Sequence, residues 1–124
     1  LTRLKSRFII ATQSNGNIAL MVNMAKRAGL PWDAILGAEV VGHYKPVPAA
    51  YTEACDRLGL APEQVLMTAA HNGDLLAARA CGLGTAFVAR PTEYGPGQSK
   101  DFRAEHDFDY IAEDFEDLAG LLGC

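Results

Sequence analysis

The chain has 124 residues, of which 49% are hydrophobic, and its formal net charge is −4. This length suffices for one hydrophobic core and not for two, so we expect a single compact domain. The negative balance argues against nucleic acid as a partner, because binding to the phosphate backbone depends on clustered Lys and Arg. No apolar run approaches the roughly 20 residues of a membrane-spanning helix, so we expect no membrane association.

The start of the chain and its cysteines bear on where the protein acts. Leu1 replaces the usual methionine, and residues 1–7 lack the apolar run and cleavage site of a secretory signal peptide, so we interpret this start as a truncation. Cys55, Cys81 and Cys124 are widely separated and form no CxxC pair for zinc or redox exchange. Such usage is typical of a reducing compartment, and we expect a cytoplasmic location.

Strands and helices are expected to alternate along the chain. Apolar and β-branched runs predict strands at 7–12, 35–41, 65–69, 85–89 and 109–112. Apolar residues at helical spacing predict helices at 18–28, 49–58, 75–81 and 115–122. Gly29, Gly59 and Gly82 follow three of these helices and supply a left-handed stop, while Asp114 precedes the last one as its N-cap.

This alternation predicts an α/β fold, a Rossmann-like parallel sheet with helices on both faces, because parallel strands need crossover helices. In such sheets, ligands bind beyond the carboxyl ends of the strands. Polar loops at 13–17, 42–48 and 70–74 follow predicted strands, and the irregular loop at 90–100 follows another. We therefore expect these loops to meet at one edge of the sheet.

Residues 14–16 (SNG) follow a predicted strand and precede a helix. Backbone N–H groups and the small polar side chains of Ser14 and Asn15 can hold an anion at such a place. The same residues would also suit an ordinary N-capping turn. Anion binding and simple turn formation therefore both remain open for this loop.

Lys45 and Asp74 are the candidates for catalytic side chains. Pro46 stiffens the loop that carries Lys45, so the ammonium group is presented from a fixed backbone and could pair with a carboxylate nucleophile. Asp74 stands where a strand turns into a helix, and it could accept a hydrogen bond from Lys45 at the strand-end edge. The alternatives are a solvated surface lysine and an aspartate that only caps the helix.

His71 could orient a water molecule or hydrogen-bond a substrate, or it could be an ordinary polar turn residue. We predict no metal site, because Mg²⁺ prefers clustered carboxylates and only Asp74 is expected near the site. A Ser-His-Asp triad is not indicated either, since Ser14 lacks the context of a nucleophile elbow. The sequence thus favours chemistry centred on Lys45 and Asp74.

The order of three motifs, 14–16 (SNG), 44–46 (YKP) and 69–74 (AAHNGD), resembles the later motifs of the haloacid dehalogenase superfamily. Residues 78–91 (ARACGLGTAFVARP) are similar to the type II branch, the L-2-haloacid dehalogenases. The resemblance covers nearly the whole chain. It implies that residues 1–124 are the C-terminal part of a single core domain of this family.

In that family, an aspartate on the first strand attacks the halogen-bearing carbon, and water hydrolyses the resulting ester. The resemblance implies a hydrolase acting on (S)-2-haloacids without a cofactor. Lys45 would pair with the nucleophile, and Asp74 would hold Lys45 and help to position the hydrolytic water. Ser14 and Asn15 would bind the substrate carboxylate or the departing halide. The full set of predicted substrate-binding residues is Ser14, Asn15, His71 and Asn72.

Two features depart from the family pattern. The strand with the nucleophile and the cap lie upstream of the segment that matches residues 7–16, so we expect this chain alone to be inactive and prone to self-association, for example as a homodimer. Ala69 and His71 stand where the dehalogenases often have Ser and Asn, which leaves the substrate open. The alternatives are a Mg²⁺-dependent phosphatase of the same superfamily, acting on a phosphate ester, and a non-catalytic α/β binding module.

Overall fold

The structure is a computed structural model that describes residues 1–93 and 95–124. The strands are β1 (Ala11–Gln13), β2 (Ala34–Leu36), β3 (Leu66–Ala69), β4 (Gly84–Val88) and β5 (Tyr110–Ala112). The helices are α1 (Thr2–Lys5), α2 (Ile18–Ala28), α3 (Ala38–Val41), α4 (Pro48–Leu58), α5 (Asn72–Ala80) and α6 (Phe115–Leu121), with a 3-10 turn, η1, at Pro62–Gln64. No described helix combines the length and the apolar content needed to cross a bilayer.

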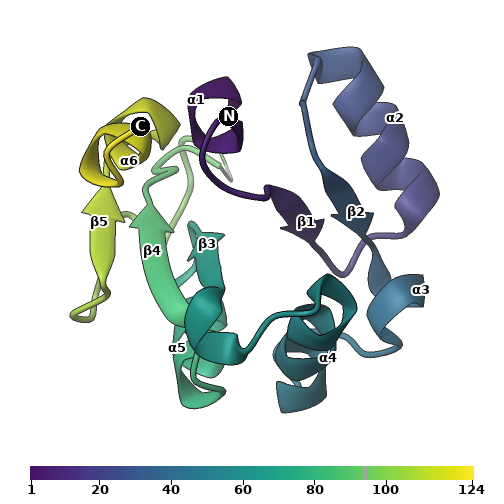
Figure 1. Ribbon diagram of the computed structural model, residues 1–124. Helices are drawn as coiled ribbons and strands as arrows, with labels where there is room; N and C mark the ends of the chain where they lie inside the picture. Colours follow the sequence, from purple (N-terminus) through teal and green to yellow (C-terminus); the bar gives the residue numbers. More distant parts are fainter. Residues whose placement is uncertain (94) are drawn as a thin grey trace.

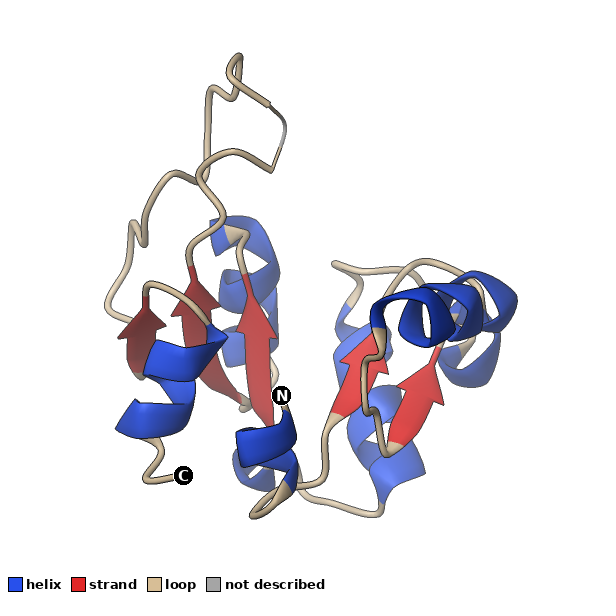
Figure 2. Cartoon of the chain, turned by 90° about the horizontal axis from the view of Figure 1, so that it is seen from above, coloured by secondary structure: helices blue, strands red, loops and turns tan. Residues whose placement is uncertain are grey.

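The strands form two parallel sheets. β1 pairs with β2, and β3, β4 and β5 form a second sheet in that order. In the view of Figure 2 the arrows of both sheets point towards the same end of the molecule, and Figure 1 shows β1 and β3 at the neighbouring edges of the two sheets. The predicted parallel α/β fold is confirmed, with one difference: among the described residues, no strand bridges β1 and β3, so the sheet is in two parts.

Side chains alternate along β4, so that each face of the larger sheet packs against its own hydrophobic core. Phe87 lies in a buried cluster with Tyr51 of α4 and Leu75 of α5. Ala86 and Val88, its neighbours in sequence, lie in a second cluster with residues of α1 and α6. Helices therefore cover both faces of this sheet, α5 on one side and α1 and α6 on the other (Figure 1). A strand buried on both faces is typical of parallel sheets.

Several helix ends follow the sequence closely. α2 and α4 end at Gly29 and Gly59, whose φ angles are 65° and 70°, in the left-handed region that glycine enters without a steric penalty. Asp114 caps α6 as predicted, since its Oδ1 accepts a hydrogen bond from Asp117 N at 2.7 Å. These ends depend on local chemistry, and the sequence therefore predicts them well.

The predicted strand at 35–41 is correct only in its first part, because β2 ends at Leu36 and the following residues form the single helical turn α3. Glu39 Oε1 in this turn accepts a hydrogen bond from Ile18 N at 2.8 Å, at the start of α2. The backbones come so close that a Cβ on Gly37 would lie 2.8 Å from Ile18 N. This tertiary contact outweighs the strand preference of the valines in α3.

Two further boundaries differ from the prediction. β1 starts at Ala11 and not at residue 7, because α1 ends in a turn in which Phe8 N donates to Leu4 O at 2.9 Å. α5 starts at Asn72 and not at Leu75. Consequently, Asp74 lies within the first turn of α5, and its side chain faces the strand-end edge from a helix instead of from a loop.

Candidate active site

Lys45, Tyr51 and Asp74 form a hydrogen-bonded cluster at the carboxyl ends of the strands. Lys45 Nζ lies 2.8 Å from Asp74 Oδ2, and Tyr51 Oη donates to Asp74 Oδ1 at 2.6 Å. The side chains of Lys45 and Asp74 are 18% and 12% exposed, and Tyr51 is fully buried. Each carboxylate oxygen of Asp74 therefore has one hydrogen-bond donor: the charged ammonium of Lys45 binds Oδ2, and the neutral hydroxyl of Tyr51 binds Oδ1.

Burial raises the pKa of the Tyr51 hydroxyl, and its hydrogen bond to Asp74 and the negative charge of that carboxylate raise it further. The phenol therefore keeps its proton at any ordinary pH and acts as a donor to Asp74. The first half of α4 supplies this tyrosine from the face that packs on α5. Tyr51 therefore donates to the Asp74 carboxylate throughout the ordinary pH range.

Asn15 fixes the backbone that carries Lys45. Its Oδ1 accepts a hydrogen bond from Lys45 N at 2.7 Å, and its Nδ2 donates to Lys45 O at 3.3 Å. One amide side chain thus pairs with both peptide groups of the lysine, although the two residues lie on the loops after β1 and α3. The loop before α4 is consequently tied to the end of β1.

Ser14 organises the turn between β1 and α2. Its Oγ accepts a hydrogen bond from Gly16 N at 3.0 Å, while Asn17 caps α2 by accepting from Leu20 N at 2.8 Å. The bond to Gly16 uses a lone pair of Ser14 Oγ, and the hydroxyl proton is not part of it. The turn chemistry considered from the sequence is therefore present, and it leaves the predicted anion-binding role compatible with the geometry.

His71 is the N-cap residue of α5 and contacts the loop that follows β4. Its Nε2 lies 2.7 Å from Glu93 Oε2. Arg90 Nη1 lies 3.6 Å from the other oxygen of the same carboxylate, Oε1. The loop at 90–100 therefore reaches the start of α5, as expected from its place after a strand.

Asn72 joins the start of α5 to a later part of the same loop. The residue is 4% exposed, and its Nδ2 donates to Asp101 Oδ1 at 3.0 Å and to Arg103 O at 3.1 Å. Its Oδ1 accepts from Glu105 N at 2.8 Å. These bonds engage both ends of the amide with the protein itself, and the contact with substrate that we predicted for Asn72 stays a prediction.

Asp101 receives two of the hydrogen bonds that Asn72 donates. Its Oδ1 also accepts from Asn72 N at 3.1 Å, and its φ of 57° is unusual for a residue other than glycine. Burial alone would raise the pKa of the Asp101 carboxyl, but the hydrogen bonds from Asn72 and the positive charges of His71 and Lys100 outweigh it and lower this pKa. The ionised carboxylate is thus the form that holds the loop.

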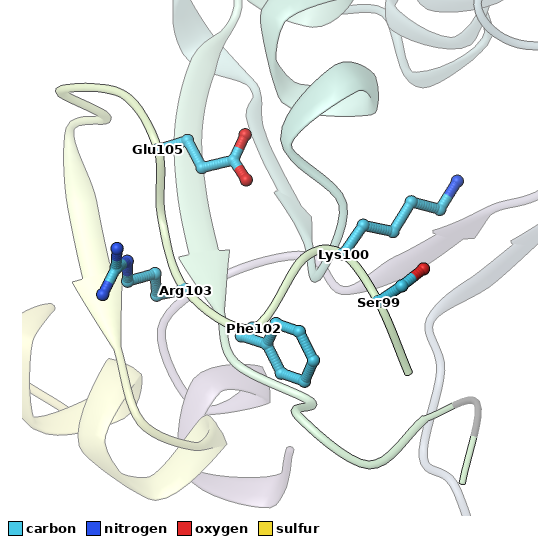
Figure 3. A pocket seen from close by; sticks show the side chains of 5 residues that line it. All are labelled: Ser99, Lys100, Phe102, Arg103 and Glu105. Atoms are coloured by element: carbon cyan, nitrogen blue, oxygen red, sulfur yellow. The ribbon is translucent and has the colours of Figure 1, made fainter. Parts of the chain in front are cut away.

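The loop after β4 also contains a cavity of about 440 Å³. The residues that line it are Ser99, Lys100, Phe102, Arg103 and Glu105 (Figure 3). The two basic side chains, Lys100 and Arg103, point to different sides of the loop (Figure 3). Their charges do not converge, and the cavity shows no arrangement that would hold a single anion.

The structure brings together most of the residues predicted from the sequence. Asn15, Lys45 and Asp74 are linked through direct contacts, and Ser14 is adjacent to Asn15 in the same turn. His71 and Asn72 precede Asp74 but are engaged mainly with the loop after β4. Within residues 1–93 and 95–124, no three His, Cys, Asp or Glu side chains gather as a metal site would require.

The sequence analysis missed Tyr51 and Glu93. Tyr51 had a usable signal, since it follows the lysine loop on the first half of a predicted helix and an aromatic hydroxyl buried there needs a partner. Glu93 had none, because it lies in an irregular loop whose path the sequence does not determine. Its contact with His71 is visible only in the structure.

The sequence matches the family of haloacid dehalogenase-like hydrolases over residues 1–82. This chain belongs to that family. It is 37% identical over 100 residues to (S)-2-haloacid dehalogenase 4A of Burkholderia cepacia, a match that covers 76% of the chain and 43% of the relative. The dehalogenase-like chain therefore spans less than half of the length of this curated relative.

Solved structures of L-2-haloacid dehalogenases have the same fold as this chain. The crystal structure of the enzyme PA0810 superposes with a TM-score of 0.95 at 56% identity, covering 98% of this chain and 52% of that one. The defluorinating enzyme Rha0230 superposes with a TM-score of 0.97 at 48% identity, covering 100% of this chain and 51% of that one. These matches confirm the predicted family and the predicted α/β fold.

Proposed function

We propose that the full-length protein, the natural polypeptide that carries this chain, releases halide from (S)-2-haloacids through an aspartyl ester. The observation that carries this proposal is the ammonium group of Lys45, held at the strand-end edge by Asp74 Oδ2 at 2.8 Å and by the Asn15 amide on its backbone. A cation fixed in this way stabilises a neighbouring carboxylate in its ionised, nucleophilic form. Similarity to enzymes named as 2-haloacid dehalogenases supports the choice of substrate.

The proposed nucleophile is an aspartate at the end of a parallel strand between β1 and β3. Each of these strands has one edge without a strand partner among the described residues, and the two edges face each other (Figure 1). An exposed strand edge presents unpaired N–H and C=O groups that another strand can satisfy. A strand parallel to both would end on the side of the sheet where Lys45 and Asp74 lie.

In the first proposed step, a carboxylate oxygen of the aspartate attacks the halogen-bearing carbon. The carbon–halogen bond breaks, and the halide leaves with the bonding electron pair. We assign the binding of the substrate carboxylate or the departing halide to Ser14 and Asn15. The polar donors at the start of α2, beside the site, support this assignment. Lys45 keeps the attacking carboxylate ionised.

In the second proposed step, water attacks the carbonyl carbon of the ester, which releases the 2-hydroxyacid and restores the aspartate. Asp74 is suited to position this water. Each of its oxygens receives one hydrogen bond from the protein, from Lys45 or from Tyr51, and keeps further lone-pair capacity. His71 and Asn72 complete the proposed substrate-binding set, His71 at the border of the site and Asn72 through the loop that it holds.

We also propose a cytoplasmic location and self-association of residues 1–124, the C-terminal part of a single core domain. The cysteines are unpaired, which fits a reducing compartment. α2 has no buried residue, and Ile9, Leu20 and Met24 are at least half exposed. Apolar surface of this kind favours association with another protein surface, such as a second copy in a homodimer.

The deciding experiment measures chloride release from L-2-chloropropionate by the full-length protein in the presence of a metal chelator. We expect release that is abolished by Lys45→Ala and unaffected by Lys26→Ala, a matched change at an exposed lysine of α2. Absence of release, together with Mg²⁺-dependent hydrolysis of a phosphate ester, would contradict the proposal and favour a phosphatase.

A further inference from the structure

Gln13, the last residue of β1, joins this strand to the first turn of α4. Its side-chain Nε2 donates a hydrogen bond to Ala50 O at 3.1 Å, although the two residues are 37 positions apart in the sequence. The carbonyl of Ala50 belongs to the peptide bond between Ala50 and Tyr51, and both of these residues are fully buried. The amide of Gln13 therefore holds the peptide group that leads into Tyr51. Nothing in the proposed reaction accounts for Gln13.

The start of α4 depends on contacts of this kind with other segments. Its N-cap residue is Val47, whose apolar side chain cannot cap a helix with a hydrogen bond. Two side chains from the end of β1 bind the backbone on either side of this helix start. Asn15 binds the N–H and C=O of Lys45, and Gln13 binds the C=O of Ala50. The backbone around the start of α4 is thus fastened to β1 at two points.

The other end of the Gln13 amide has no partner. Oε1 is buried and accepts no hydrogen bond from the residues that the structure describes. The contact with Ala50 determines which end of the amide is which, because an oxygen in place of Nε2 would face the carbonyl oxygen of Ala50. A buried acceptor without a donor costs more free energy than one added hydrogen bond contributes. The amide of Gln13 is therefore not explained by a contribution to stability.

We propose that Gln13 is a positioning residue, which holds Tyr51 in place through the Ala50 peptide group so that Tyr51 can orient Asp74. This inference rests on the proposed function, in which Asp74 positions the water that hydrolyses the ester. Tyr51 Oη donates to Asp74 Oδ1 at 2.6 Å, and a hydrogen bond this short requires that the helix carrying the phenol stays in one place. Gln13 acts through α4 and does not touch the reacting atoms. Its unpaired Oε1 fits a side chain that serves the geometry of a site and not the stability of the fold.

Urea denaturation of the full-length protein carrying Gln13→Met tests the stability argument. Methionine has nearly the shape of glutamine but no amide oxygen that would be left without a donor. Ala50 O keeps the helical hydrogen bond from the N–H four residues further on. We therefore expect the urea midpoint to equal that of the wild type or to exceed it. A lower midpoint together with an unchanged kcat would identify a purely structural role and would overturn the proposal.

NMR of the full-length protein with ¹³C-labelled tyrosine reports on Tyr51 without any need for activity. Tyr51→Phe identifies the Tyr51 Cζ signal. This carbon carries the hydroxyl and lies at the far end of the ring from the Ala50 peptide group, so its signal follows the hydrogen bond to Asp74. We expect Gln13→Met to shift this signal. Arg57→Met, at an exposed position near the end of the same helix, is the control and leaves the signal unchanged.

Kinetics give a further readout, which a purely structural role would not change. Slower hydrolysis lets the ester accumulate, so we expect Gln13→Met to lower kcat about tenfold and to lower KM in the same proportion. Mixing enzyme and substrate rapidly should then release a first burst of halide equal to the amount of enzyme. Arg57→Met matches the wild type. Higher KM at constant kcat would indicate a role in substrate binding and would contradict the assignment.

The NMR and kinetic readouts separate this inference from the proposed function. If the wild type releases no halide, the proposed function fails, and the Tyr51 signal alone decides whether Gln13 positions the tyrosine. If Gln13→Met leaves the Tyr51 Cζ signal unchanged, the role assigned to Gln13 is wrong, whatever the activity of the enzyme.

Discussion

Lys45 Nζ lies 2.8 Å from Asp74 Oδ2, and this ion pair joins the two halves of the molecule. Lys45 belongs to the part of the chain that contains the smaller sheet, and Asp74 lies in the first turn of α5, which packs on the larger one. No described strand links the two sheets. The pair therefore has a structural role in addition to its proposed catalytic one.

The first prediction concerns the stability that this pair provides. Lys45→Met leaves the Asp74 carboxylate with Tyr51 as its remaining partner, at a side chain that is only 12% exposed. Because a poorly solvated charge that loses a partner is costly, we expect a loss of about 2 kcal/mol in the free energy of unfolding. Urea denaturation measures it. Lys26→Met, on the surface of α2, is the control, and an equal effect of both changes would contradict the prediction.

The second prediction concerns Tyr51, whose ring is fully buried. Tyr51→Phe keeps the ring and removes the hydroxyl that donates to Asp74 at 2.6 Å. We expect the free energy of unfolding to fall by about 1.5–3 kcal/mol, the range for hydrogen bonds to charged groups, and kcat for halide release to fall about tenfold.

Tyr44→Phe provides the matched control for this change, because Tyr44 lies next to Lys45 in the same loop but is 64% exposed. Chemical denaturation and steady-state halide release are measured on both variants. Equal kcat values for the wild type and Tyr51→Phe would show that the hydroxyl does not help to orient Asp74.

The parts of the fold that follow from local chemistry could be predicted from the sequence. α2 has the predicted limits, because Asn17 caps its start and Gly29 stops it. The strand at 35–41 could not be assigned correctly, since α3 depends on Glu39 reaching the start of α2. Such contacts between distant segments leave no local pattern in the sequence.

In the candidate site, too, some features could be predicted from the sequence and others depend on contacts between distant segments. The positions of Lys45 and Asp74 follow from the rule that loops after parallel strands share one edge. The partners that hold them do not follow from it: Tyr51 was not singled out, and the contact of the Asn15 amide with the backbone of Lys45 was not foreseen. The predicted anion-binding role of Asn15 stays a prediction. Spacing places a side chain at an edge, and only packing determines which neighbour it binds.

The third prediction tests the role of Asn15 in fixing Lys45. Asn15→Ala removes both hydrogen bonds to the lysine backbone, at 2.7 Å and 3.3 Å, and leaves the ammonium group and its pairing with Asp74 intact. We expect kcat/KM for halide release to fall about tenfold or more, because even a small displacement of a catalytic group lowers the reaction rate strongly. Asn23→Ala, at an exposed position of α2, serves as the control. A kcat/KM equal to that of the control would mean that the loop holds Lys45 without Asn15.

The last prediction concerns the loop held by Asn72 and Asp101. The pKa of Asp101 is lower in the folded protein than its ordinary value of 3.8, since hydrogen bonds from Asn72 outweigh the effect of burial. The unfolded chain therefore binds this proton more readily than the folded one, and acid weakens the folded state. The stabilisation from Asp101 is complete well above pH 3.8 and is lost as the pH falls through the lower pKa of the folded state.

Asp101→Asn removes the negative charge of the side chain and preserves the local backbone geometry. Asparagine also tolerates the φ of 57°, and its carbonyl oxygen can still accept from Asn72. We expect the variant to be less stable than the wild type at pH 6 and the difference to shrink towards pH 3, as measured by urea denaturation at both pH values. Asp107→Asn, at an exposed aspartate of the same loop, controls for the loss of one negative charge. A difference that stays constant between the two pH values would show that the carboxylate charge of Asp101 does not hold the loop on α5, because only a charge-dependent contact disappears on protonation.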